Sequence, residues 1–278
     1  MTTLVTGATG NTGRHVVAEL VRRGERVRAL TRNPAAAAAA GRLPAEVELV
    51  AGTHTAPERL DAALDGVSRL HITVTAGLAE VGPELVRRAV GAGVRRITVL
   101  WGGGVGPVEQ AVADSGVEWT RLEPQEFMSN TLAWSESVRS EGIVREPYDF
   151  PSALVHEADI AAVAAVALLE DGHAGRAYNL TGPESLTPRE RIAILSRAIR
   201  RDIDFVPITH EQAVDRLMAT GVPRADADYV IGWYSAPSDA STTVVDTVKQ
   251  VTGHPARTFA QWVAEHTEHF QAPRVKAG

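Results

Sequence analysis

The sequence predicts an α/β protein with a doubly wound parallel sheet and a smaller, helix-rich C-terminal lobe. Two observations predict it. A run rich in β-branched residues at 2–6 leads directly into Gly7, Gly10 and Gly13, and an amphipathic helix pattern follows at 12–23. Strand and helix patterns then alternate through about residue 121. Such alternation is typical of parallel strands joined by right-handed helical crossovers.

Each element of the first part follows from hydrophobic periodicity and from its flanking turn residues. After the opening strand at 2–6, strands are predicted at 26–30, 47–50, 69–74, 95–100 and 117–121, and helices at 12–23, 57–65, 79–91 and 107–115. Beyond residue 122 the pattern becomes helical, with helices at 126–139, 157–169, 187–200, 209–219, 223–234, 241–252 and 258–270 and short strands near 176–180 and 203–206. We therefore expect a sheet domain at 1–122 and a substrate lobe at 123–278, packed as one compact body.

The glycine turn at 7–13 predicts a Rossmann-type dinucleotide site. In such a turn, the position of Gly7 lets the chain leave the strand sharply, and that of Gly10 lets the backbone approach a pyrophosphate. Gly13 lets the following helix lie against the sheet, so that its first N–H groups face the phosphates.

The tip of the second strand predicts which dinucleotide binds. A site specific for NAD carries an acidic residue about 20 residues after the glycines, to hold the ribose 2′-hydroxyl. This chain has Arg32 and Asn33 there instead. A guanidinium suits a 2′-phosphate, so we expect NADP(H). The alternative is that Arg32 is an ordinary solvated surface arginine. The expected cofactor-binding residues are Gly7, Thr9, Gly10, Asn11, Thr12, Gly13, Arg32, Asn33, Thr53, Val74, Thr75, Ala76 and Trp101.

Composition excludes several function classes. The net charge is −6 with no clustered basic stripe, which argues against nucleic acid as a partner. The chain has no cysteine, so disulfides, thiolate metal sites and cysteine nucleophiles are excluded, and we expect no metal. Met1 leads directly into a strand and no long apolar run follows, so we expect neither a signal peptide nor a membrane partner, and a cytoplasmic location. The sequence leaves open whether the protein forms a homodimer.

Several motifs resemble the NmrA-like branch of the atypical short-chain dehydrogenase/reductases. The resemblance lies in Thr6–Gly13, in the TRNP stretch at 31–34, in Trp119–Asn130, and in later segments at 155–160, 178–184 and 251–262. It implies a Rossmann fold and NAD(P)H binding. The family contains NADPH-dependent reductases, among them quinone and imine reductases, and also nucleotide-sensing regulators without catalytic activity.

The chain departs from that family at the positions where ordinary dehydrogenase chemistry resides. Related dehydrogenases use a Tyr-x-x-x-Lys pair, but none of the four tyrosines here has a lysine four residues on. Trp101 and three glycines replace the serine that often ends the fifth strand, and Glu123 replaces the arginine of the family's L-R-P motif.

Candidate residues for chemistry follow from these positions. Tyr148 and His156 are the expected catalytic proton donors, with Glu123 and Glu126 as further candidates. Each has a structural alternative: a half-buried packing residue for Tyr148, a helix cap for His156, and solvated carboxylates for Glu123 and Glu126. The expected substrate-binding residues are Trp101, Gly102, Gln125, Phe127, Met128 and Asn130. Trp101 could stack on a planar substrate or anchor its own loop, and Phe127 and Met128 could equally belong to the core.

The function that these residues favour is NADPH-dependent reduction of a small, largely apolar carbonyl, quinone or iminium compound. Hydride transfer is the cofactor's own chemistry, so a protein acid is helpful but not always required. Two alternatives stay open, a non-catalytic NAD(P)-sensing protein and a non-redox isomerase or cyclase on the same scaffold.

Overall fold

The computed structural model describes residues 1–75, 77–101, 103–236 and 238–271, and it divides the chain into two compact units. The first unit contains 1–124, 157–180 and 247–254, and the second contains 125–156, 181–246 and 255–278. The first unit therefore includes three segments that the sequence assigned to the 123–278 lobe. They are the end of the sixth strand, 157–180 and 247–254.

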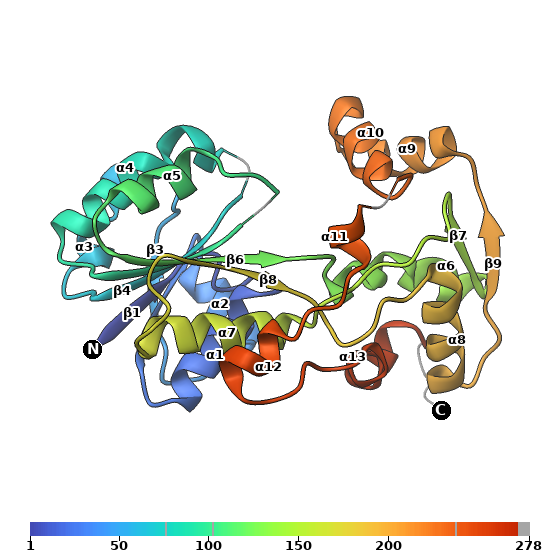
Figure 1. The fold of residues 1–278 in the computed structure, drawn as a ribbon, viewed down its shortest axis with the longest axis horizontal. Helices are drawn as coiled ribbons and strands as arrows, with labels where there is room; N and C mark the ends of the chain where they lie inside the picture. The colour runs from blue at the N-terminus through green and yellow to red at the C-terminus, as the bar shows by residue number, and fades with distance from the viewer. Residues whose placement is uncertain (76, 102, 237, 272–278) are drawn as a thin grey trace. The chain divides into compact units, whose positions relative to one another are not determined.

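The first unit is built on a seven-stranded sheet in the order β3-β2-β1-β4-β5-β6-β8, with every neighbouring pair parallel (Figure 1). The predicted doubly wound parallel sheet is therefore confirmed. Its strands are β1 (Thr2–Val5), β2 (Arg26–Thr31), β3 (Glu48–Ala51), β4 (Arg69–Thr73), β5 (Arg96–Leu100), β6 (Glu118–Pro124) and β8 (Arg176–Leu180).

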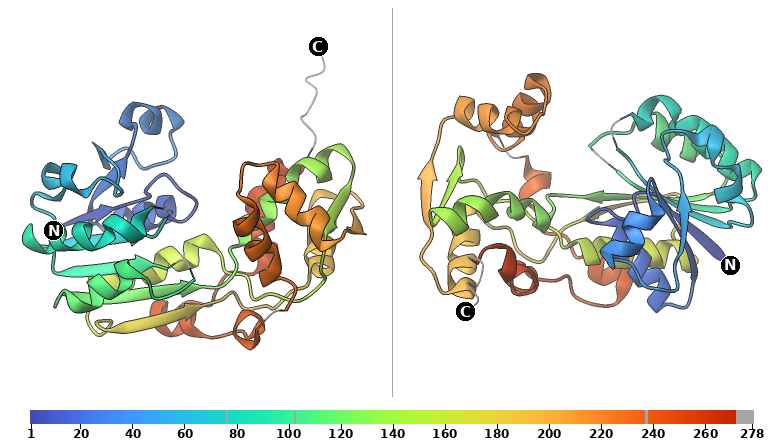
Figure 2. Two further views of the ribbon diagram at one scale, coloured as in Figure 1. Left: turned by 90° about the horizontal axis from the view of Figure 1, so that it is seen from above. Right: turned by 180° about the vertical axis from the view of Figure 1, so that it is seen from behind.

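Helices cover both faces of this sheet. Figures 1 and 2 show α4 and α5 on one face and α1, α7 and α12 on the other. The helices of the unit are α1 (Gly13–Arg22), α2 (Pro34–Ala40), η1 (Pro57–Arg59), α3 (Asp61–Leu64), α4 (Leu78–Gly91), α5 (Pro107–Asp114), α7 (Glu157–Leu169) and α12 (Thr247–Thr252).

Helix α7 explains why the chain returns to the first unit. Its sequence, EADIAAVAAVALL, is apolar on all sides, and ten of its residues are buried. A helix with no polar face must be covered on all sides. The small alanines let α7 pack closely against α1 and the sheet, and β8 then extends the sheet beside β6.

The second unit is helix-rich, with one small parallel pair of strands, β7 (Ile143–Glu146) and β9 (Asp204–Pro207). Its core contains large apolar side chains such as Leu195, Phe259 and Trp262. Its helices are η2 (Met128–Trp134), α6 (Ser135–Ser140), α8 (Pro188–Ile199), α9 (His210–Met218), α10 (Arg224–Trp233), α11 (Asp239–Thr242), α13 (Phe259–His266) and η3 (Thr267–His269).

Four helix predictions were wrong in detail. The helix predicted at 57–65 is the 3₁₀ helix η1 followed by the short α3, and the one predicted at 258–270 is α13 followed by the 3₁₀ helix η3. The segment predicted as one helix at 126–139 is a 3₁₀ helix, η2, followed by the short α6, and 241–252 is divided between α11 and α12 by an extended stretch. In the part of the chain that the structure describes, no helix combines the length and the apolar character needed to span a membrane.

Candidate functional site

The glycine turn after β1 forms a cradle that side chains would fill. Gly7 has a φ of +61°, and a Cβ built on it would lie 3.0 Å from the side chain of Thr73. A Cβ on Gly13 would lie 2.7 Å from the carbonyl carbon of Gly7, which no real contact allows. Gly10 donates its N–H to the Gly7 carbonyl at 2.9 Å, which closes the turn. The structure therefore gives Gly7 and Gly13 a steric reason.

Helix α1 begins next to this turn. Its N-cap, Thr12, is buried and gives its first turn no side-chain cap within the described residues. Thr9 and Asn11 lie at the exposed rim of the turn. The N–H groups of Arg14 and His15 donate to the carbonyls of Gly10 and Thr12, at 3.2 and 2.9 Å. The dipole of a helix that begins beside a glycine turn favours a phosphate group, so the turn fits the pyrophosphate of a dinucleotide.

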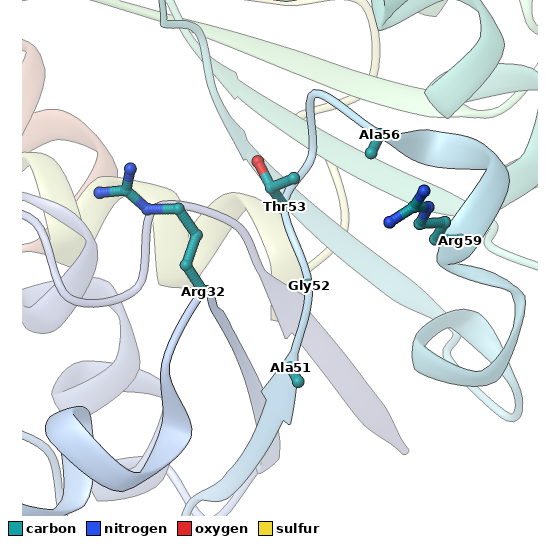
Figure 3. A pocket seen from close by; sticks show the side chains of 6 residues that line it. All are labelled: Arg32, Ala51, Gly52, Thr53, Ala56 and Arg59. Atoms are coloured by element: carbon teal, nitrogen blue, oxygen red, sulfur yellow. The ribbon is translucent and has the colours of Figure 1, made fainter.

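A pocket lies at the carboxyl ends of β2 and β3, with a volume of about 300 Å³ (Figure 3). Two arginines, Arg32 and Arg59, line it, and none of the residues that line it is acidic. Its lining is Arg32, Ala51, Gly52, Thr53, Ala56 and Arg59. Arg59 contacts Glu58 only loosely, at 3.6 Å on the exposed surface. The pocket therefore presents positive charge, as a site for a ribose 2′-phosphate requires.

Local packing brings the loop after β3 to this pocket. A Cβ on Gly52 would lie 2.9 Å from methyl groups of both Leu30 and Leu60, so a side chain there would have to displace these two leucines. Asn33 accepts a hydrogen bond from the N–H of Ala36 at 3.0 Å and thereby caps α2. Its side-chain oxygen is thus used by the helix cap, while its side-chain amide nitrogen can still donate a hydrogen bond to a ligand.

The segments after β3 and β4 are joined by a side-chain bond. His54 Nε2 lies 2.8 Å from the hydroxyl of Thr75. Burial lowers the pKa of His54, so its imidazole is neutral at pH 7. Val74 is half-buried beside this contact, and Ala76 lies outside the described residues. The bond ties together two loops that both follow carboxyl ends of the sheet.

Trp101 directly follows β5 and is half-buried. Its indole N–H donates to the carbonyl of Gly104, and its backbone N–H donates to Leu122 at 3.1 Å. The first bond is the one expected of a residue that anchors its own loop. It occupies the indole edge only, so stacking of the ring on a ligand stays a prediction. Gly102 lies outside the described residues.

The predicted substrate residues at 125–130 lie in the second unit and differ in burial. Met128 is 1% exposed and belongs to the core, so the structure favours its core role. Phe127 is half-buried and pairs through its backbone with Val155, while Gln125 is half-buried and Asn130 exposed. Only the last three have surface that a ligand could reach.

The predicted proton donors are mostly engaged with other groups. His156 is buried and lies 3.3 Å from Glu265, so an internal role fits it better than contact with a substrate. Glu123 accepts from Arg121 at 2.6 Å, and Glu126 pairs with Arg191 at 3.0 Å. The solvated-carboxylate alternative therefore describes neither residue.

Tyr148 is half-buried and belongs to a polar chain in the second unit. Its hydroxyl lies 2.9 Å from His210 Nδ1, and His210 Nε2 lies 3.2 Å from Asp228. If Nε2 carries the proton toward the carboxylate, Nδ1 accepts from the phenol. No local sequence pattern indicates this arrangement, because Tyr148 and His210 are 62 positions apart and His210 and Asp228 are 18 apart.

Comparisons with known proteins fit this geometry. The model of the NmrA-like family matches residues 1–102. The chain is 39% identical to "(4-alkanoyl-5-oxo-2,5-dihydrofuran-3-yl)methyl phosphate reductase" of Streptomyces griseus subsp. griseus, over 96% of this chain and 98% of the relative. The chain belongs to the NmrA-like family. The resemblance inferred from the sequence is confirmed.

Two further NmrA-like relatives are redox enzymes. The NAD(P)H azoreductase of Xenophilus azovorans is 35% identical, over 97% of this chain and 99% of the relative. The NADPH-dependent quinone oxidoreductase of Escherichia coli, solved with NADPH, is 25% identical, with a TM-score of 0.79 over 96% of this chain and 99% of that one. This NmrA-like chain is an oxidoreductase.

Three residues of this NmrA-like chain escaped the sequence analysis. Arg59 lines the pocket from the 3₁₀ helix η1, and its only signal was an arginine shortly after the third strand. Arg191 pairs with Glu126 at 3.0 Å in the second unit, and burial and the charge of Glu126 raise the pKa of Tyr234 in the same unit. Their positions depend on how α8 and α10 pack, which no local pattern reveals. The described residues bring together no cluster of His, Asp and Glu that would hold a metal ion.

Proposed function

We propose that this chain reduces small, largely apolar compounds that carry a conjugated carbonyl, quinone or iminium group, without a Tyr-x-x-x-Lys pair. The cofactor is NADP(H). The observation that carries the proposal is the arginine-lined pocket beside the glycine cradle, in a chain whose full-length relatives are reductases.

Residues of the first unit fit the cofactor part by part. The glycine turn and the N-terminus of α1 would hold the pyrophosphate, and Arg32 and Arg59 would hold the 2′-phosphate. When bound, NADPH supplies the hydride. What remains for the chain is to align the acceptor and to exclude water from it.

The relatives suggest which acceptors to try. Their names specify a furanone phosphate ester and azo compounds, and the similar solved structure is a quinone reductase. All of these accept a hydride into a conjugated π system. Such acceptors delocalise the added charge, so the reaction depends less on a strong protein acid than ketone reduction does. This fits a chain with no Tyr-x-x-x-Lys pair.

Steady-state oxidation of NADPH by the purified protein tests the proposal. The acceptors are 1,4-naphthoquinone, an azo dye and an unsaturated lactone, each compared with a saturated ketone. We expect turnover with at least one conjugated acceptor and preference for NADPH over NADH. Tight NADPH binding without turnover of any acceptor would instead support the NAD(P)-sensing alternative. Conversion of a substrate without net oxidation of NADPH would support the isomerase or cyclase alternative.

We further propose that the enzyme works in the cytoplasm on a small-molecule substrate, with neither nucleic acid nor a membrane as partner. The net charge of −6 supports the exclusion of nucleic acid as a partner.

A further inference from the structure

A hydrogen bond joins two loops of the first unit at the carboxyl ends of its strands. His54 stands three residues after β3, and its Nε2 lies 2.8 Å from the hydroxyl of Thr75, two residues after β4. In the sheet, β2 and β1 lie between β3 and β4. Adjacent strands are about 4.8 Å apart, so these two strand ends are about 14 Å apart, and only loops that bend toward each other can form this bond. We call it the His54–Thr75 bridge.

A tight turn after β3 carries His54. The N–H of Ala56 donates to the carbonyl of Thr53 at 3.1 Å, which closes the turn. Before the turn, the N–H of Gly52 donates to the carbonyl of Thr31 at 2.9 Å and keeps the loop beside β2. Thr53 and Ala56, on either side of His54 in the sequence, both line the arginine-lined pocket (Figure 3). The bridge therefore borders that pocket.

The other end of the bridge is attached to the strand that leads into the glycine turn. The N–H of Thr73 donates to the hydroxyl of Thr6 at 2.9 Å, and the hydroxyl of Thr73 donates to the carbonyl of Thr6 at 3.3 Å. Thr6 is fully buried and directly precedes Gly7. Thr75 thus stands two residues from a point that is bonded twice to the end of β1. The bridge links the wall of the pocket to the strands beside the glycine turn.

The adenosine part of NADP(H) belongs between these two anchored points. In the site proposed above, the glycine turn holds the pyrophosphate, and Arg32 and Arg59 hold the 2′-phosphate. The ribose of the adenosine carries that phosphate and is also linked to the pyrophosphate. The pocket wall at 53–56 is therefore the wall that the adenosine meets.

The bridge neither carries charge nor holds the arginines. Burial lowers the pKa of His54, so its imidazole is neutral at pH 7. Arg59 lies on η1, and this segment is anchored by the buried side chains of Pro57 and Leu60. Loss of the bridge should therefore loosen the turn at 53–56 but leave the positive charge that distinguishes NADPH from NADH.

Resting on the cofactor site proposed above, we propose that His54 is a positioning residue for the dinucleotide. Its bond to Thr75 holds the turn at 53–56 as a wall for the adenosine, and it thereby retains NADPH and NADH to the same extent. Selection between the two nucleotides belongs to Arg32 and Arg59. Retention and selection are thus carried by different side chains of one site.

Titration of the whole purified protein with NADPH and with NADH, together with the rate of nucleotide release, tests this without any substrate. His54→Phe keeps an aromatic ring but cannot bond Thr75, and Thr75→Val removes the hydroxyl from the same bond. Each should weaken both nucleotides by the same factor, about three- to tenfold, the effect of one lost hydrogen bond. Release should become faster by a similar factor. His54→Gln, whose side-chain amide can donate to Thr75, should recover most of the affinity.

The double variant His54→Phe, Thr75→Val should bind no more weakly than the weaker of the two single variants, because both changes remove the same bond. His173→Phe is the matched control. His173 Nδ1 lies 2.7 Å from the hydroxyl of Tyr178, a bond of the same kind, but His173 precedes β8 and so lies at the amino end of the sheet. This control should leave both affinities unchanged, whereas Arg32→Ala should weaken NADPH alone.

Wild-type affinities in His54→Phe, losses that multiply in the double variant, or a loss confined to NADPH would overturn the inference. If Gly10→Val and Arg32→Ala still weaken NADPH in that case, the proposed cofactor site stands without the bridge. If none of these variants changes nucleotide binding, the cofactor site has been placed at the wrong residues and both proposals fail together.

Discussion

Around the glycine turn, the space left for a side chain differs from one glycine to the next. A side chain on Gly13 would have to move the backbone of Gly7 and Ala8. A Cβ on Gly7 would meet the side chain of Thr73 at 3.0 Å in a left-handed backbone conformation, whereas Gly10 differs. A Cβ on Gly10 would meet only the Gly7 carbonyl oxygen, at 3.1 Å. A branched side chain there is tolerable for the fold but occupies the space in front of the turn.

Gly10→Val should therefore reduce NADPH affinity by about 10- to 100-fold, the effect of losing one or two charge-assisted hydrogen bonds to phosphate. The measurement is NADPH titration together with thermal unfolding. Gly91→Ala is the control, since a Cβ at this helical position meets no atom within 4 Å. A folded Gly10→Val protein with undiminished NADPH affinity would refute the assignment of the turn.

Cofactor choice should depend on Arg32 and Arg59 together. Both line the same pocket, so each contributes to the positive charge that a 2′-phosphate meets. Arg32→Ala should weaken NADPH by about tenfold and leave NADH nearly unchanged, and Arg59→Ala should act in the same sense by a smaller factor. Arg26→Ala, at the opposite end of β2 and exposed, is the control. Equal losses for the two nucleotides would contradict the assignment.

His71 should make folding stability depend on pH. It is fully buried in β4, with Nδ1 2.8 Å from the hydroxyl of Thr98, and burial lowers its pKa from 6.5 to about 4. Between these values the unfolded chain binds the proton and the folded chain does not. Stability is therefore complete above pH 6.5 and declines as the pH falls toward 4, by up to roughly 3 kcal/mol.

Denaturant unfolding at a series of pH values checks this, with His71→Asn as the comparison. The amide of asparagine keeps a polar partner for Thr98 but does not titrate. Contributions of other groups are common to both proteins, so the wild type should lose more stability between pH 6.5 and 4. Parallel curves would show that His71 does not carry the effect.

At the scale of elements, prediction succeeded where one local pattern decides the structure. The glycine turn and Arg32 lie beside strands with clear periodicity, so the sequence alone located them. The run at Ala35–Ala40 folds as α2, with Asn33 as N-cap and Pro34 at the first helical position, although it was not predicted as a helix. Four residues of β7 were too few to show alternation.

Trp101, in the loop after β5, has two possible roles that substitutions can separate: contact with a planar substrate, or anchoring of its own loop. If the ring contacts a planar substrate, Trp101→Ala should lower kcat/KM for 1,4-naphthoquinone by about 1–2 kcal/mol, or five- to thirtyfold, with little change in Tm. Trp101→Phe should recover most of this, because it keeps an aromatic face. If the residue only anchors its loop through the bond to Gly104, Trp101→Phe should lower kcat/KM as much as Trp101→Ala does. Both variants should then also have a lower Tm than the wild type.

At the scale of the whole molecule, the two units are built from interleaved segments. The chain leaves the first unit after Pro124, returns at Glu157 with α7, and returns again at Thr247 with α12. In the sequence, only the first of these three transitions between units is visible, as a change from alternating strands and helices to a helical pattern. The other two depend on which face α7 and α12 bury, which is a tertiary property. This is also why Arg191 and Tyr234, carried by later segments, could not be associated with Glu126 from the sequence.

The whole chain should catalyse its reaction without lysine. Its only lysines are Lys249, exposed on α12, and Lys276, outside the described residues. Neither stands four residues after a tyrosine, so neither can lower a tyrosine's pKa as the family's usual pair does. The double variant Lys249→Met, Lys276→Met should therefore fold, bind NADPH and retain nearly all of its kcat/KM on whichever conjugated acceptor the wild type reduces. Steady-state kinetics and an NADPH titration on the same preparation decide this. A protein that binds NADPH normally but has lost turnover would mean that a lysine contacts the reacting groups and that the active site has been placed at the wrong residues.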